Sequence, residues 1–116
     1  MGLRERRGRK DLFPGALEMM ILHVLRHQRL HGYALVQTIK RTSDDLLQVE
    51  EGSLYPALQR MLKSGLVRAR WEMSPSGRRV RTYAITARGA AHLDDQVSSF
   101  ERMLEGIRRV LAPVKP

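Results

Sequence analysis

Arginine and lysine are the residues whose type and position suggest a chemistry for this sequence. They number 21, against 12 aspartates and glutamates, and the formal net charge is +9. Residues 1–10 hold five basic residues and one acidic residue, and residues 63–90 hold seven and one, while the rest of the chain is nearly neutral. Guanidinium and ammonium groups bind phosphates, so this uneven surplus predicts a polyanionic partner.

The sequence gives less support for metal binding or catalysis than for binding to a polyanion. His23, His27 and His31 recur every four residues and would align on one continuous helix, but we expect the helix to break before His31. The chain has no cysteine, so we predict no metal site and no cofactor. Ser53 lies in no Gly-x-Ser-x-Gly motif, and no paired carboxylates or glycine-rich phosphate loop are found, which argues against an enzyme.

Two helices are predicted in the first half of the chain from apolar residues at helical spacing. The first begins at Pro14, which suits a first helical turn, and ends between residues 28 and 32, where Gly32 can stop it. Its apolar face consists of Leu17, Met20, Ile21, Val24 and Leu25. A short second helix follows and ends in the polar residues 42–45.

A third helix has the clearest predicted boundaries. Ser53 is placed to cap its N-terminus, Pro56 lies in its first turn, and Gly65 follows its C-terminus. The free backbone N–H groups at its start could face a phosphate. Its outer face offers side chains for contacts with DNA: Ser53, Tyr55, Gln59, Arg60 and Lys63.

A β-hairpin is predicted after this helix, because the apolar residues change to a period of two. Residues 67–73 alternate between apolar and charged side chains, residues 74–77 form a turn, and residues 78–85 return. The hairpin carries Arg78, Arg79 and Arg81, which suit the backbone or minor groove of DNA. The sequence does not determine which face of the hairpin each arginine occupies, because a shift of one residue in the strand pairing would move it to the other face.

The last predicted helix begins after Thr86 and carries a heptad pattern of apolar residues up to Leu111. Such a narrow, regular stripe is typical of a helix that packs against a partner helix. It predicts a homodimer held by Leu93, Val97, Phe100, Leu104, Ile107 and Leu111. Packing inside the single chain is the alternative.

The order of these elements predicts a mainly α fold with a small β-hairpin, namely a winged helix-turn-helix followed by a long C-terminal dimerisation helix. Residues 1–11 are expected to form a basic flexible arm, either solvated or in contact with DNA, residues 12–86 the DNA-binding domain, and residues 87–112 the dimerisation helix. We find no secretion signal or membrane span and expect a cytoplasmic protein that does not bind a membrane.

Four motifs in this order resemble the PadR-like transcriptional regulators. They are HGYAL at 31–35, EGSLYPAL at 51–58, SGLV at 64–67, and GRR at 77–79 followed by YAIT at 83–86 and Gly89. The resemblance covers roughly residues 12–111, and the single closing helix looks like the short subfamily. It implies a homodimeric DNA-binding repressor, dimerised through the last helix with help from the first.

The resemblance also implies that an inverted-repeat operator is the double-stranded DNA partner and that, in some members, a small-molecule effector relieves repression. By position it assigns Ser53, Tyr55 and Pro56 to the recognition helix and the three hairpin arginines to the wing. The chain departs from many relatives at Thr82, where a tyrosine is common. Its one tryptophan, Trp71, lies in the hairpin rather than in the last helix. The sequence therefore does not support a site on the last helix for flat aromatic drugs.

Two other functions stay open at this stage. The same basic surface would serve a non-specific nucleoid or RNA-binding protein, which lacks a strong preference for one site. A ligand-sensing protein-interaction module would instead bind DNA weakly.

Overall fold

The order of elements along the chain follows the sequence prediction. The structure, a computed structural model, describes residues 15–114, so the basic arm at 1–11 and Pro14 lie outside the described residues. The elements are α2 (Ala16–His27), β1 (Leu30–His31), α3 (Gly32–Thr42), α4 (Glu51–Lys63), β2 (Val67–Met73), β3 (Arg79–Ile85) and α5 (Ala87–Leu111). The mainly α fold with a small sheet and a long last helix is confirmed.

An aliphatic core holds the helices together. Seven large side chains are fully buried: Ile21, Leu22, Leu35, Leu54, Leu58, Met61 and Leu93. They come from α2, α3, α4 and α5, so the three short helices share one core with the beginning of the long helix. Close packing of this kind fixes α4 relative to its neighbours and leaves its other side free.

The N-terminus of α4 corrects one prediction. The helix begins at Glu51 with Glu50 as its N-cap residue, so Ser53 is not the cap. The Ser53 N–H instead donates to the Glu50 carbonyl at 2.9 Å. The helix therefore starts earlier than predicted, and Pro56 lies inside it rather than in its first turn.

The C-terminus of α4 confirms the prediction for Gly65. This glycine has a φ of 77°, in the left-handed region that glycine adopts without strain. Its N–H donates to the Leu62 carbonyl at 3.2 Å, and the Leu66 N–H donates to the Met61 carbonyl at 2.9 Å. These two hydrogen bonds form a Schellman motif, which turns the chain from α4 into the hairpin.

The sheet has three strands in the order β1-β3-β2, one more than the sequence predicted. Strand β1 pairs antiparallel to β3 through only two residues, which is too short to show an alternating pattern. Gly32 does not stop the first helix, because α2 ends at His27 and Gly32 is the first residue of α3. The register of β2 and β3 places Trp71 opposite Arg81 and Met73 opposite Arg79. This pairing determines the face of the hairpin on which each arginine lies.

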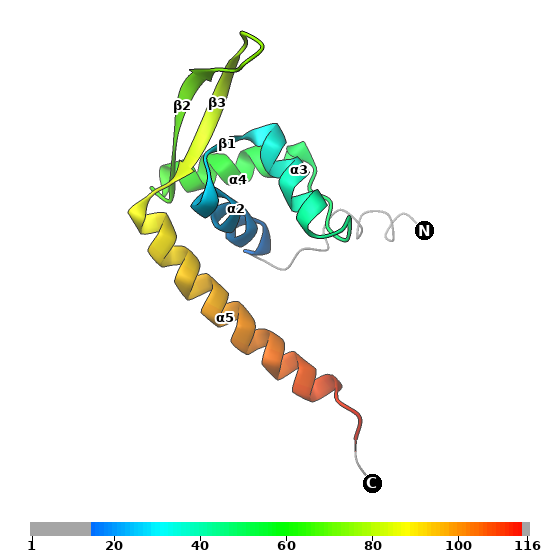
Figure 1. Cartoon of the computed structure of the whole chain (residues 1–116). Coiled ribbons are helices and arrows are strands. Elements are labelled where there is room, and N and C mark those ends of the chain that lie inside the picture. The colour runs from blue at the N-terminus through cyan, green and yellow to red at the C-terminus, as the bar shows by residue number, and fades with distance from the viewer. Residues whose placement is uncertain (1–14, 115–116) are drawn as a thin grey trace.

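Helix α5 begins inside the domain and then leaves it. The Thr86 hydroxyl accepts a hydrogen bond from the Gly89 N–H at 3.0 Å, so the predicted cap is confirmed. A side chain at Gly89 would overlap the Leu66 carbonyl oxygen, so glycine lets α5 approach the end of α4 closely. Figure 1 shows the second half of α5 and the β2–β3 hairpin projecting from the helical core on different sides.

Candidate nucleic-acid interface

The side of α4 that faces away from the core carries the six α4 residues among the nine residues predicted to contact DNA. These residues are exposed: Ser53, Tyr55, Pro56, Gln59, Arg60 and Lys63. The opposite side is buried through Leu54, Ala57, Leu58 and Met61. The helix is therefore anchored along one side and presents polar and basic groups along the other.

Tyr55 combines packing with exposure. A Cβ added at Gly32 would lie 2.6 Å from the Tyr55 hydroxyl oxygen and 2.7 Å from Cε1, so the ring rests on the first residue of α3. The side chain is nevertheless 42% exposed. Its pKa is raised above the usual value by burial and, to a smaller extent, by the negative charge of Glu51 and by the neighbouring Tyr83, so the neutral phenol is the form present near neutral pH.

The two basic residues of α4 differ in their surroundings. The Arg60 Nε lies 3.4 Å from the Glu18 Oε2 of α2, and both groups remain accessible to water. An exposed pair of this kind contributes about 0–1 kcal/mol, so a phosphate can replace the carboxylate as the partner of Arg60. Lys63 lies in the last turn of α4 and is exposed.

The wing, defined here as β2, β3 and the turn between them, has two faces with different charge. On one face Glu72 pairs with Arg70 at 2.8 Å and with Arg29 at 3.6 Å. The other face carries Arg79 and Arg81. Within residues 15–114 neither of these, nor Arg78, forms an ion pair, so their charges stay available.

A groove of about 570 Å³ joins the start of α4 to the wing. It brings Tyr55 together with Arg78, Arg79 and Arg81. Tyr55 is the only one of the six predicted α4 residues that lines this groove, and the other five, Ser53, Pro56, Gln59, Arg60 and Lys63, do not.

His31 and Tyr33 are among the lining residues of this groove that were not predicted as contacts. Tyr33 is exposed, and its hydroxyl accepts a hydrogen bond from the Gln37 side chain at 2.6 Å. His31 also lines the groove. Only the pairing of β1 with β3 places them beside the wing, and a two-residue strand gives no signal in the sequence.

The three regularly spaced histidines do not share one helix. His23 and His27 lie on α2 with their ring centres 5.1 Å apart. His31 lies beyond the end of α2 and caps α3, where its Nδ1 accepts a hydrogen bond from the Ala34 N–H at 3.2 Å. The predicted break before His31 is confirmed, and no group of three potential ligands gathers in the described part of the chain.

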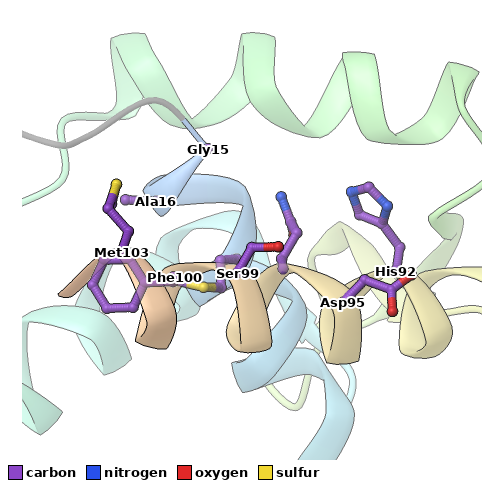
Figure 2. A pocket seen from close by; sticks show the side chains of 9 residues that line it. Gly15, Ala16, His92, Asp95, Ser99, Phe100 and Met103 are labelled. Atoms are coloured by element: carbon purple, nitrogen blue, oxygen red, sulfur yellow. The ribbon is translucent and has the colours of Figure 1, made fainter. Parts of the chain in front are cut away.

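A second region of interest lies between α2 and α5. A cavity of about 470 Å³ lies there. Figure 2 shows that Phe100 and Met103 lie near Ala16 at one end of it, while His92 and Asp95 lie at the other end. A mainly apolar cavity of about 410 Å³ is lined by other residues of α2, α3 and α5, and the two cavities share Met19 and Phe100. Both are therefore bordered by α2 and by the predicted seam of α5.

The predicted seam residues of α5 fall into two groups. Leu93 is fully buried inside the single chain and corrects the prediction that it faces a partner, because its surface is already covered by its own domain. Val97, Phe100 and Leu104 are partly buried, whereas Ile107 and Leu111 are exposed.

No helix between residues 15 and 114 has the length and apolar character needed to cross a membrane.

Solved structures of transcriptional regulators have the same fold. One from Clostridium thermocellum has a TM-score of 0.80 at 24% identity, covering 88% of this chain and 96% of that one. A PadR-like regulator from Bacillus cereus has a TM-score of 0.74 at 27% identity, covering 87% and 96%. Bacillus subtilis PadR in complex with operator DNA has a TM-score of 0.63 at 23% identity, covering 70% of this chain and 46% of that one.

The sequence itself matches a family model. Residues 21–95 match the transcriptional regulator PadR-like family, a class of proteins that are generally not enzymes. This match covers α2 from Ile21 onward, all of α3 and α4, both strands of the wing and the start of α5. With more than half of its residues in that match, the chain belongs to the PadR-like family of transcriptional regulators.

Proposed function

We propose that this protein is a homodimeric, sequence-specific repressor that binds double-stranded DNA at an inverted-repeat operator. The observation that carries the proposal is the groove in which Tyr55 of α4 meets the three wing arginines. Helix α4 enters the major groove and reads base edges with Tyr55 and Gln59, while the wing contacts the phosphate backbone. We also propose that the protein acts in the cytoplasm, together with its DNA partner.

The known complex of Bacillus subtilis PadR with operator DNA supports this proposal, because that protein shares the fold of the present chain. Two copies of α4 related by a two-fold axis read two half-sites about 34 Å apart, one turn of the duplex. The sequence of such an operator is therefore an inverted repeat. We assign residues 12–86 to DNA binding and, within residues 87–112, the half of α5 that carries Phe100, Leu104, Ile107 and Leu111 to dimerisation.

The second half of α5 supports the dimer. Phe100, Leu104, Ile107 and Leu111 follow one another at heptad spacing, and exposure increases toward the end of the helix. Leu111 is 76% exposed in the single chain. A second copy of the same helix offers the matching apolar row, which buries these side chains from both subunits.

We propose that a small-molecule effector relieves repression by binding between α2 and α5. The two cavities there share Met19 and Phe100, and Phe100 also belongs to the proposed dimer seam. A ligand in this region that favours one packing of α5 changes the spacing of the two α4 helices. Ligand titration followed by NMR tests this, since release of DNA without movement of the Met19 and Phe100 signals would contradict it.

Selection of bound fragments from genomic DNA, followed by affinity measurements, tests the proposed function. We expect one inverted repeat to bind on the order of a thousandfold or more tightly than random duplex at the same salt concentration. Equal affinity for both duplexes would indicate a non-specific nucleoid protein instead. Weak binding to all DNA would favour the protein-interaction module.

A further inference from the structure

The one tryptophan of the chain lies in an exposed position on the wing. Val67 and Ala69 precede Trp71 on the same face of β2 and pack in or against the core, but Trp71 itself is 57% exposed. Core packing therefore does not account for an indole ring at this position. Its neighbours on the paired strand give another explanation.

Two arginines lie over the Trp71 ring. Arg81 is directly opposite Trp71 in the register, and Arg79 lies two residues before Arg81 in β3 on the same face. The guanidinium carbon of Arg79 lies 4.7 Å from the centre of the ring, and that of Arg81 lies 5.9 Å from it. Both distances fall within the range of cation–π attraction.

This arrangement holds the two arginines without neutralising them. On the opposite face of the wing a carboxylate, Glu72, binds Arg70 and offsets its charge. On the Trp71 face an uncharged ring provides the attraction, so both positive charges remain for a polyanion. The ring also restricts side chains that otherwise lose considerable rotamer freedom when they bind.

We propose that Trp71 is a positioning residue for DNA binding, which holds Arg79 and Arg81 in the orientation that contacts the phosphate backbone. The inference rests on the proposed DNA-binding function and deepens it. Trp71 acts through the two arginines and itself makes no contact with a base. Its contribution is therefore the same for every DNA sequence.

Replacement of the ring without a change in charge tests the proposal. Trp71→Leu keeps an apolar side chain but removes the aromatic face, and we expect roughly three- to tenfold weaker binding to selected and random duplexes alike. The dependence of affinity on salt stays unchanged, because both arginines are retained. Trp71→Phe recovers part of the loss, since it restores an aromatic face.

Met73→Ala is the matched control, because Met73 is the next exposed residue on the same face of β2. We expect it to bind as wild type does. A loss as large as that of Trp71→Leu would overturn the proposal, since general loss of apolar surface would then explain both variants.

A double-mutant comparison separates positioning from direct contact. In a chain that carries Arg79→Ala and Arg81→Ala, the further change Trp71→Leu has no additional effect if the ring acts only through the arginines. A loss of the same size in that background would show that the ring contacts DNA itself and would overturn the proposal.

NMR of the free protein tests the stack without DNA. We expect the Nε–Hε signals of Arg79 and Arg81 to shift when Trp71→Leu removes the ring, and unchanged signals would overturn the stack. Wild-type protein that binds no duplex would overturn the proposed function and with it the role of Trp71. Wild-type binding that Trp71→Leu leaves intact would overturn only the positioning role.

Discussion

The wing and the second half of α5 both project from the helical core, but they expose opposite kinds of surface (Figure 1). The wing exposes Arg78, Arg79 and Arg81, which are well solvated as charges until a polyanion arrives. Helix α5 exposes Ile107, Val110 and Leu111, whose apolar surface is unfavourable in water. Water therefore satisfies the exposed arginine charges of the wing until DNA binds, whereas the exposed apolar side chains of α5 gain from being covered.

A second contrast lies within α5 itself. Leu93 and Leu111 belong to the same heptad pattern, yet Leu93 is fully buried and Leu111 is 76% exposed. Their own chain covers the first through α2, while residues 15–114 provide no cover for the second. One continuous stripe thus serves two purposes, first folding and then the proposed association.

The largest expected effect separates these two parts of α5. Leu93→Ala creates a cavity in the core and should lower the free energy of unfolding by about 2–5 kcal/mol. Leu111→Ala should change it by less than about 0.5 kcal/mol, because that side chain is already exposed. Urea denaturation measures both, in a chain that also carries Leu104→Glu so that association does not contribute. Equal losses would show that the division of α5 is wrong.

The next effect concerns the partner of α5. Leu104→Glu places a charge in the proposed apolar seam and should weaken the dimer at least roughly a hundredfold. Ser98→Glu adds the same charge at an exposed position outside the seam and is the control. Sedimentation equilibrium measures the dimer. If Leu104→Glu sediments as the wild-type dimer does, α5 has another partner surface.

Substitutions in α4 should affect DNA binding differently from substitutions in the wing. Tyr55→Phe removes the hydroxyl but keeps the ring that packs on Gly32, and Gln59→Ala removes an exposed amide. Each should weaken binding to the selected operator by about 1–3 kcal/mol per lost base contact and leave random duplex nearly unaffected. Parallel titrations with both duplexes measure this, and equal weakening on both would assign these residues to the backbone.

The smallest expected effect comes from removing single arginines of the wing, and it tests which face of the wing contacts DNA. Arg79→Ala, and in the same way Arg81→Ala, should weaken operator and random duplex together by roughly three- to tenfold and lower the salt slope by about one. Arg70→Ala is the control, because its guanidinium is already paired with Glu72 on the other face. A lower salt slope for Arg70→Ala as well would mean that both faces of the wing contact DNA.

The sequence alone determined most of the elements and their order. Apolar spacing located the four helices, Gly65 marked the end of α4, and Thr86 marked the start of α5. The period of two located both strands of the wing. These features depend on local backbone preferences and on which side of an element is apolar. Both are determined by residues that are close together in the sequence.

The sequence did not predict two features correctly, the start of α4 and the existence of β1. Ser53 suits an N-cap by type, but the helix begins earlier, at Glu51. Strand β1 exists because β3 lies beside it, and its two residues carry no pattern of their own. That pairing also brings His31 and Tyr33 to the groove of the wing.

Only the tertiary structure decided which surfaces remain free. The heptad pattern of α5 predicts that a stripe must be buried, but it does not say whether its own domain or another chain buries it, and packing against α2 settles this for Leu93. The alternation of the wing likewise leaves the faces of the arginines open until the register of β2 and β3 is fixed. That register puts Arg79 and Arg81 over Trp71 and Arg70 beside Glu72, because side chains two residues apart on a strand share a face.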